Sequence, residues 1–366
     1  MKILLCVDRL TGGGAQRVAS LWACGWAERG YDVAIVLSNI RAAQTYNIPE
    51  EIPVYDIDWP INNGYIRHFL KFCFSSYRFS RIIKKEKPSV IISVGTYWSK
   101  IVYRGRLLSG VKCKIVCTDH NSYERPSNSP MSKRDSYIKF KYNKRFDVVT
   151  VLTNADKQFI NNRLTNVEVL PNPLTYKISN CIPNKRKIIL AVGRLDAGYV
   201  KGFDILLNAY SKLDANDWKL RIVGGGRKES LKRYQDLALQ LGISSKVEFA
   251  GFVDEPLPLY KEAGIFVLSS RFEGFGMVLV EAMSQSCACV ACDYKGRQKE
   301  IITSDEYGLI CKPDDPTELA RCLNKLIDNN DYLFKLQENA PLRAAYYSLD
   351  RIMERWDAIF NKLSLL

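Results

Sequence analysis

The sequence predicts an α/β protein made of two similar Rossmann-like units joined near residue 171. The chain has 366 residues, more than one ordinary hydrophobic core accommodates. In both halves short β-branched runs alternate with amphipathic stretches, which is typical of parallel sheets covered by helices on both faces. The segment Leu170-Pro171-Asn172-Pro173-Leu174 and the polar residues up to Lys187 interrupt this alternation, which indicates a connection between two domains.

The N-terminal half contains five apolar runs, each bounded by polar, Gly or Pro residues, that we expect to be strands. The runs are KILLCV, DVAIVL, SVIISV, KIVCT and DVVTVL, and helical patterns lie between them at about residues 15–29, 66–86 and 132–145. The first run meets Asp8 and Arg9 at once, which favours a buried strand over a signal peptide.

The C-terminal half repeats this series. Strands are expected at about residues 188–192, 219–223, 247–250, 265–268 and 289–291, and helices at about 202–212, 228–241, 277–286 and 316–329. A last helix, at about 342–363, carries Tyr346, Ile352, Trp356 and Phe360 on or near one stripe. We therefore predict an N-terminal domain over residues 1–171, a C-terminal domain over 172–341 and a final helical segment over 342–366.

The composition favours a soluble cytoplasmic enzyme. No apolar run reaches the roughly 18–20 residues that span a bilayer. Eleven cysteines without a secretory signal indicate a reducing compartment. The cluster of Cys287, Cys289 and Cys292 is interpreted as small buried hydrophobic residues, because the chain has only two histidines and no second cysteine pair at zinc spacing. We expect no metal site.

A glycine-rich turn, Thr11-Gly12-Gly13-Gly14-Ala15-Gln16-Arg17, follows the first strand and opens a helix. Glycines allow the backbone to approach a ligand, and a helix N-terminus presents free N–H groups to an anion. The turn lacks the G-x-G-x-x-G spacing, and no acidic residue closes the second strand, which argues against a dinucleotide oxidoreductase. A purely structural turn remains the alternative.

Two motifs in the C-terminal half suggest a diphosphate and a sugar. Gly193-Arg194-Leu195 and Lys201-Gly202 place two cations in a loop between a strand and a helix, which suits a diphosphate; a surface salt-bridged pair is the alternative. In the segment Ser269–Ala282, Glu273 lies in a glycine-containing loop and Glu281 lies eight residues later in a helix. Carboxylates only accept hydrogen bonds, so this pair is suited to sugar and ribose hydroxyls.

This combination resembles glycosyltransferase family 4, which has the GT-B architecture. The resemblance covers nearly the whole chain. It rests on the early glycine turn, Asp119-His120-Asn121, Pro171-Asn172-Pro173, Gly193-Arg194-Leu195 with Lys201-Gly202, Gly224-Gly225-Gly226, and the two glutamates Glu273 and Glu281 with seven residues between them. Two features depart from the family pattern, namely a longer loop over residues 196–200 and Gly225 in place of an acidic residue.

The resemblance implies two facing domains with a deep cleft and a C-terminal helix that returns to the N-terminal domain. It also implies a metal-independent, retaining transferase that resembles bacterial enzymes of polyprenyl-diphosphate-linked glycan and lipopolysaccharide biosynthesis. Arg194 and Lys201 would bind the donor diphosphate, and Glu281 the ribose. Glu273 would contact the transferred sugar.

Other implied positions complete the donor and acceptor sites. Gly193 belongs to the diphosphate loop, and the backbone N–H groups of Gly276, Met277 and Val278 would face the donor. Gly13 and Gly14 would lie beside the phosphates and the acceptor. His120 would contact the sugar's hydroxyls near the reacting centre, although a lone histidine after a strand is also often structural.

The chemistry agrees with these residue types. Transfer from a nucleotide sugar creates an oxocarbenium-like centre and a departing diphosphate, and preplaced positive charge stabilises that leaving charge. Arg194, Lys201 and the helix N-terminus near Gly276 supply this charge. No carboxylate is a clear covalent nucleophile, so we favour front-face transfer in which the leaving phosphate helps to deprotonate the acceptor.

Charge is distributed unevenly along the chain. Residues 1–171 contain 26 Lys and Arg against 14 Asp and Glu, whereas residues 172–366 contain 27 against 25. Within the basic half, Arg67, Lys71, Phe74, Arg78, Arg81 and Lys85 form one helical stripe, and residues 133–145 are also basic and aromatic. We predict that the stripe contacts the anionic inner face of the plasma membrane. An ordinary solvated helix face is the alternative.

The leading interpretation is therefore a cytoplasmic, peripheral-membrane glycosyltransferase. It would use a nucleotide sugar, a UDP-hexose or UDP-N-acetylhexosamine, to extend a lipid-linked acceptor without a metal or other cofactor. Nucleic acid is not an expected partner. Two alternatives remain: a GT-B sugar-nucleotide epimerase, which would release UDP without an acceptor, and a non-enzymatic nucleic-acid-binding protein, suggested by the basic half.

Overall fold

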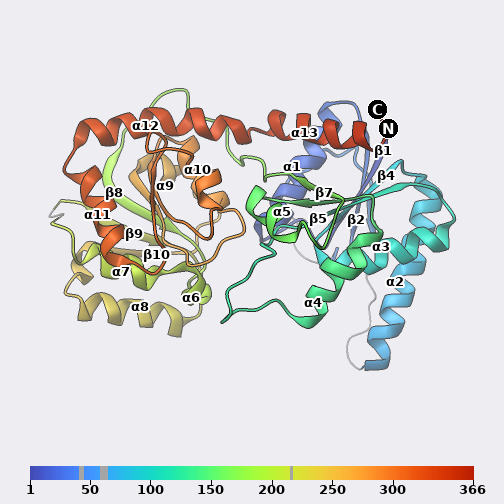
Figure 1. The fold of residues 1–366 in the computed structure, drawn as a ribbon, viewed down its shortest axis with the longest axis horizontal. Coiled ribbons are helices and arrows are strands. Elements are labelled where there is room, and N and C mark those ends of the chain that lie inside the picture. The colour runs from blue at the N-terminus through green and yellow to red at the C-terminus, as the bar shows by residue number, and fades with distance from the viewer. Residues whose placement is uncertain (41–44, 58–64, 215–216) are drawn as a thin grey trace. The chain divides into compact units, whose positions relative to one another are not determined.

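The computed structural model describes residues 1–40, 45–57, 65–214 and 217–366, with the side chains of residues 65–69 excepted (Figure 1). The chain divides into two compact units. Unit 1 comprises Met1–Thr175 and Leu349–Leu366, and unit 2 comprises Tyr176–Ser348. The last helix therefore belongs to the same unit as the N-terminus.

Unit 1 is built on a parallel seven-stranded sheet with the order β3-β2-β1-β4-β5-β6-β7. Its strands are β1 (Lys2–Val7), β2 (Asp32–Leu37), β3 (Val54–Asp56), β4 (Val90–Val94), β5 (Lys114–Thr118), β6 (Val148–Val151) and β7 (Val167–Val169). The inner strands are continuous apolar runs because both faces of the sheet are covered.

The helices of unit 1 pack against its sheet and against one another. They are α1 (Gly14–Glu28), α2 (Tyr65–Glu86), α3 (Thr96–Ser109), α4 (Lys133–Tyr137), α5 (Asn154–Ile160) and α13 (Leu349–Lys362), and α4 continues into a π-helix over Ile138–Tyr142 and a 3₁₀ turn over Asn143–Arg145. Leu4 and Cys6 of β1 share a core with Phe79 of α2 and Trp98 of α3. Helices α1 and α13 lie side by side (Figure 1).

Helix α13 packs on α1 through aromatic side chains. Trp356 is fully buried, and its ring lies 5.1 Å from the rings of both Trp22 and Trp26. At the edge of this contact, the Arg29 guanidinium pairs with the Asp357 carboxylate at 2.5 Å. The C-terminal helix thus returns to the N-terminal unit, as the fold class requires.

Unit 2 contains a parallel six-stranded sheet with the order β10-β9-β8-β11-β12-β13. Its strands are β8 (Arg186–Val192), β9 (Lys219–Val223), β10 (Val247–Gly251), β11 (Ala263–Leu268), β12 (Ala288–Cys292) and β13 (Leu309–Cys311). Its helices are α6 (Gly198–Lys201), α7 (Phe203–Tyr210), α8 (Lys228–Gln240), α9 (Leu257–Glu262), α10 (Met277–Ser284), α11 (Pro316–Ile327) and α12 (Asn330–Ala344).

The predicted class of two parallel-sheet α/β domains is confirmed, with corrections to individual elements. The helix predicted from residue 342 begins at Leu349, because α12 runs through Pro341 and ends at Ala344. The helix predicted over 132–145 is broken into α4, the π-helix and the 3₁₀ turn. Strands β3, β7 and β13 were not predicted, because each has only three residues and leaves little periodicity.

Candidate functional site

In unit 2 the predicted donor residues follow two neighbouring strands. Strand β8 lies beside β11 at the centre of the sheet, where the strand order changes direction. The loops after such strands form the usual ligand-binding position of open α/β sheets. Gly193 and Arg194 follow β8, and the loop that contains Glu273 follows β11.

Lys201 and Glu273 are in direct contact. The Lys201 ammonium nitrogen lies 2.5 Å from Oε1 of Glu273, and the Ser270 hydroxyl donates to the same oxygen at 2.8 Å. Both charged side chains remain partly exposed, at 22% and 15%. The structure therefore joins two predicted site residues from different motifs into one polar cluster, with Ser270 as an additional member.

The loop that carries Lys201 is fixed by close backbone packing. Gly202 has φ 62°, and a Cβ at this position would lie 2.1 Å from the Ser269 carbonyl oxygen, so a side chain cannot be accommodated. The Ser269 hydroxyl donates to the Lys201 carbonyl at 2.9 Å. The longer loop noted in the sequence forms a 3₁₀ turn over Leu195–Ala197 and then the single turn of α6.

Arg271 holds the same loop from the other side. Its guanidinium forms two hydrogen bonds with the Asp204 carboxylate, at 2.8 and 2.7 Å, and donates to the Tyr199 carbonyl at 3.0 Å. An ion pair with Asp314 adds to this set. These carboxylates raise the pKa of Arg271 above its usual value, so its charge is permanent.

Arg194 is exposed at the start of the diphosphate loop. Its charge helps to lower the pKa of the Asp196 carboxyl, after the larger effect of the hydrogen bond from the Arg227 N–H. The preceding Gly193 lies against the Lys201 side chain, since a Cβ on Gly193 would lie 3.2 Å from Cδ of Lys201. The two predicted cationic motifs are therefore adjacent.

Helix α10 begins at Met277, directly after the loop of Glu273. Gly276 caps it with φ 95°, and the N–H groups of Met277 and Val278 belong to its first turn, where helical N–H groups lack partners within the helix. This arrangement offers hydrogen-bond donors and the positive end of the helix dipole to an anion.

Glu281 lies inside α10 and is almost fully buried. The hydroxyl of Tyr260, on α9, donates to its Oε2 at 3.0 Å. Burial and the Glu281 charge raise the pKa of Tyr260 well above its usual value, so the phenol stays protonated and remains a donor. The sequence did not indicate Tyr260, because it lies 21 residues away and no motif includes it.

In unit 1, His120 follows β5 and is partly buried. Its Nδ1 lies 3.0 Å from Oδ1 of Asn172, its Nε2 lies 3.3 Å from the Thr118 hydroxyl, and its ring is 5.5 Å from that of Trp22. Burial lowers the pKa of His120 below its usual value of 6.5, although the Asn172 contact and the Asp119 charge oppose this effect. The imidazole is therefore neutral at pH 7.

A cavity of about 500 Å³ lies at the carboxyl ends of β1, β2, β4 and β5. It is lined by Asp8, Ala15, Gln16, Ser38, Asn39, Lys71, Val94, Gly95, Thr96, Tyr97, His120 and Asn121. Gly13 and Gly14 adjoin it at the start of α1, and Gln16 is held by a 2.8 Å hydrogen bond to Asp8. The structure thus places His120 and the glycine turn around one cavity of unit 1.

The basic stripe predicted on α2 is only partly exposed. Arg81 and Lys85 are exposed, whereas Lys71 and Arg78 are half-buried, and Lys71 lines the cavity beside His120. The side chain of Arg67 lies outside the described residues. Among the side chains of α2 that the structure describes, Leu70 and Tyr77 are the most exposed large apolar ones, so the described exposed face is rotated from the predicted stripe and is both apolar and basic.

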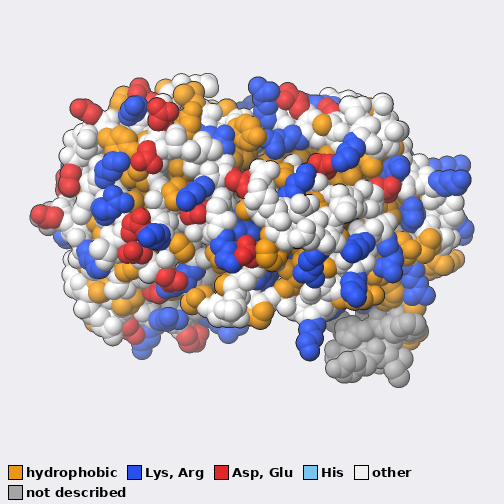
Figure 2. All heavy atoms as spheres, in the orientation of Figure 1, with side chains coloured by type: hydrophobic (Ala, Val, Ile, Leu, Met, Phe, Trp, Pro, Cys, Tyr) orange, Lys and Arg blue, Asp and Glu red, His pale blue; other side chains and the backbone are white. Residues whose placement is uncertain are grey.

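Figure 2 shows Lys and Arg side chains gathered over α3 and α4 of unit 1, with few acidic side chains among them. Within the described residues no helix is long and apolar enough to cross a membrane. The same residues contain no group of three His, Cys, Asp or Glu side chains placed to hold a metal ion.

Two family models together match residues 12–343. Residues 12–175 match Glycosyltransferase Family 4, and residues 175–343 match Glycosyl transferases group 1. The amylovoran biosynthesis glycosyltransferase AmsD of Erwinia amylovora is 27% identical over 98% of this chain and 99% of its own length. A Campylobacter jejuni enzyme, N-acetylgalactosamine-N,N'-diacetylbacillosaminyl-diphospho-undecaprenol 4-alpha-N-acetylgalactosaminyltransferase, is 26% identical over 98% of both chains.

Solved structures share the fold over the full length. The lipopolysaccharide outer core galactosyltransferase WaaB has a TM-score of 0.78 and 22% identity, with 99% of this chain and 100% of that chain covered. Anabaena HepE in complex with UDP has a TM-score of 0.80 and 20% identity, and both chains are covered completely. These neighbours confirm the predicted GT-B fold class.

Proposed function

The chain belongs to the glycosyltransferases that join a family 4 domain to a group 1 domain, and from this premise we propose that it transfers a hexose or N-acetylhexosamine from a UDP-sugar to a lipid-linked glycan. The observation that carries the proposal is the cluster of Lys201, Glu273 and Ser270 beside the first turn of α10. The cluster combines hydrogen-bond donors that can bind an anion with a carboxylate that can accept hydrogen bonds from sugar hydroxyl groups.

The donor half of the proposal assigns one role to each residue of unit 2. Arg194 and Lys201 neutralise the diphosphate, together with the N–H groups of Met277 and Val278. Glu281, held by Tyr260, accepts hydrogen bonds from the ribose hydroxyls. Because the leaving diphosphate gains negative charge as the glycosidic bond breaks, these fixed cations stabilise the transition state more than the ground state.

The acceptor half uses the cavity of unit 1. A neutral His120 forms one hydrogen bond with a hydroxyl of the transferred sugar. Gly13 and Gly14 leave room for the acceptor beside the cavity. We propose front-face transfer with retention of anomeric configuration, in which a phosphate oxygen of the departing diphosphate removes the acceptor proton. The reaction needs no metal in this scheme, since Arg194 and Lys201 carry the compensating charge.

The relatives suggest the kind of acceptor. The Campylobacter enzyme acts on a diphospho-undecaprenol glycan by its name, and AmsD by its name serves amylovoran biosynthesis. Such an acceptor stays in the bilayer, so we propose that the protein works as a peripheral protein at the inner face of the plasma membrane, in cell-surface polysaccharide biosynthesis. The exposed apolar and basic face of α2 supports this location.

The function is tested by mixing the purified protein with radiolabelled UDP-hexoses and UDP-N-acetylhexosamines, bacterial lipid extract and EDTA. We expect label from one donor to enter the lipid-linked fraction, with its anomeric configuration retained by NMR. Release of UDP without any acceptor would indicate an epimerase instead. A strict need for Mn²⁺ or Mg²⁺ would contradict the metal-free scheme, and no transfer from any UDP-sugar would contradict the donor class.

A further inference from the structure

The turn that carries His120 is closed by a buried carboxylate. Oδ1 of Asp119 accepts a hydrogen bond from the Asn121 N–H at 3.1 Å, which spans His120 in the manner of an Asx turn. The Asp119 N–H in turn donates to the Thr150 carbonyl of β6 at 3.2 Å. His120 is thus the central residue of a turn whose two flanking residues are held to each other.

Lys139 binds both sides of this turn. Its ammonium nitrogen lies 2.6 Å from Oδ2 of Asp119 and 3.5 Å from the Asn121 carbonyl oxygen. It also lies 4.3 Å from the centre of the Tyr123 ring, within cation–π distance. The side chains of Lys139 and Asp119 are 4% and 3% exposed, so the pair is shielded from water and from salt.

Lys139 lies on a short π-helical segment. Residues Ile138–Tyr142 form a π-helix, and Lys139 points into the unit, whereas Lys141, two residues later, is exposed. Single π-helical turns are rare in proteins overall, and those that occur are often found at functional sites. A buried ion pair seldom adds stability compared with apolar residues of the same size, so its presence beside His120 calls for another role.

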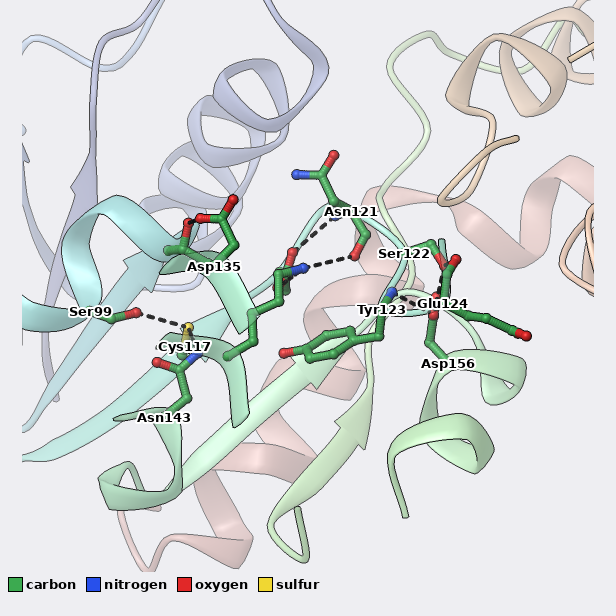
Figure 3. A network of polar contacts seen from close by, with 12 residues as sticks. Ser99, Cys117, Asn121, Ser122, Tyr123, Glu124, Asp135, Asn143 and Asp156 are labelled. Carbon is green, nitrogen blue, oxygen red and sulfur yellow. Dashed lines mark hydrogen bonds and ion pairs between the residues drawn. The ribbon is translucent and has the colours of Figure 1, made fainter. Parts of the chain in front are cut away.

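The far end of the turn is held separately. Asp156 accepts hydrogen bonds from the Ser122 hydroxyl at 2.9 Å and from the Tyr123 N–H at 2.8 Å, and it is fully buried. Figure 3 shows this network around Asn121, Ser122, Tyr123 and Asp156. Since Asp156 fixes the later part of the turn, the specific task left to Lys139 is the part around His120.

We propose that Lys139 is a positioning residue for His120: the buried Lys139–Asp119 pair fixes the turn that carries the imidazole and balances the charge beside it. The proposal deepens the proposed glycosyl transfer, on which the role of His120 rests. A balanced pair keeps the imidazole neutral, so that it can hydrogen-bond a sugar hydroxyl. An unbalanced Asp119 would favour the imidazolium.

Because Lys139 and Asp119 carry opposite charges, removing one or the other should shift the His120 pKa in opposite directions. Burial lowers the pKa of His120, the contact with Asn172 and the Asp119 charge raise it, and the Lys139 charge lowers it. Asp8 and Lys71 line the same cavity. Lys139→Met should therefore raise the His120 pKa, Asp119→Asn should lower it, and the double variant should return close to the starting value.

The His120 pKa can be measured by NMR titration, without an assay of enzyme activity. Its only two histidines are His68 and His120, so His68→Gln leaves a single imidazole signal in NMR. In that background we expect Lys139→Met to raise the His120 pKa and Asp119→Asn to lower it. Lys141→Met, a lysine of the same helical turn that faces solvent, is the matched control and should leave the titration unchanged.

The double variant Asp119→Asn/Lys139→Met keeps the test valid if a single variant unfolds, because it leaves no buried charge alone. It should fold and titrate near the background value. Unchanged His120 titration in a folded Lys139→Met or Asp119→Asn protein, or shifts of the same sign in both, would overturn the proposal. Because NMR reports the imidazole directly, this failure differs from a failure to transfer sugar, which would contradict the proposed function instead.

Discussion

Lys201 combines two tasks in one ammonium group, since it neutralises Glu273 in the free protein and is proposed to bind the donor diphosphate. Lys201→Met keeps the length of the side chain and removes its charge. We expect turnover to fall at least about tenfold, because stabilisation of the leaving diphosphate is lost. The measurement is kcat with thermal unfolding as the folding control.

Lys228→Met is the matched variant for Lys201, because Lys228 is an exposed lysine of the same unit at the start of α8. It should leave both turnover and melting temperature unchanged. Full activity in Lys201→Met would contradict the assignment of this residue to the donor site. An equal loss of turnover in Lys228→Met would show that the loss follows from the lower net charge of the protein and not from the position of Lys201.

Tyr260 is expected to act on nucleotide affinity. Tyr260→Phe removes the hydroxyl that donates to Glu281 and leaves the ring in place. A hydrogen bond to a carboxylate contributes about 1.5–3 kcal/mol, so UDP binding should weaken roughly tenfold while kcat at saturating donor changes little. Tyr210→Phe is the control, since the buried Tyr210 hydroxyl donates to the Trp218 carbonyl in the same unit. A fall in kcat with unchanged UDP affinity would contradict the assignment.

The sequence predicted the charged residues of the site better than their partners. Glu273, Glu281 and Lys201 stand in short motifs with fixed spacing, so their chemistry is visible in the sequence. Tyr260 and Lys139 are not visible in this way. Tyr260 meets Glu281 because α9 packs on α10, and Lys139 lies in a basic stretch whose pattern does not indicate which lysine is buried.

At the scale of elements, the packing of α13 on α1 centres on Trp356. Trp356 is fully buried against Trp22 and Trp26. Trp356→Ala should cost about 3–5 kcal/mol of unfolding free energy and lower the melting temperature. Trp356→Phe should cost clearly less, because the indole nitrogen has no hydrogen-bond partner among the described residues and the ring contacts persist in part. Equal melting temperatures for Trp356→Ala and wild type would contradict this packing.

Helix α2 carries the membrane prediction, with its residues revised by the structure. Arg81, Lys84 and Lys85 are exposed, so changing all three to Glu reverses the charge of the exposed face. Thermal unfolding is the folding control, because Lys85 also lies 4.8 Å from the centre of the Tyr55 ring. Each cation near an anionic surface contributes about 1 kcal/mol, so co-sedimentation with anionic liposomes should be lost at low salt.

The control reverses three exposed cations on α8 of unit 2, Lys228, Lys232 and Arg233, which should leave liposome binding intact. Equal binding by wild type and the α2 variant would exclude α2 from membrane contact. The sequence predicted that α2 is basic and amphipathic. The rotation of its exposed face toward Leu70 and Tyr77 followed only from how α2 packs against α3.

At the scale of the whole molecule, the predicted two-unit α/β organisation is the part that sequence patterns specify best. Parallel strands buried on both faces appear as apolar runs, and the turns between them contain Gly, Pro and polar residues. The predicted start of the last helix, at about residue 342, is too early. Helix α12 continues through Pro341 to Ala344, and α13 begins at Leu349.

The central claim is that the chain binds the UDP part of a nucleotide sugar through unit 2. The most direct measurement is isothermal titration of UDP and GDP into wild type and into Glu281→Gln, with folding checked by thermal unfolding. We expect UDP to bind one site per chain, GDP to bind at least about tenfold more weakly, and Glu281→Gln to weaken UDP by a similar factor. No UDP binding by folded wild type, or tighter binding of GDP, would contradict the claim.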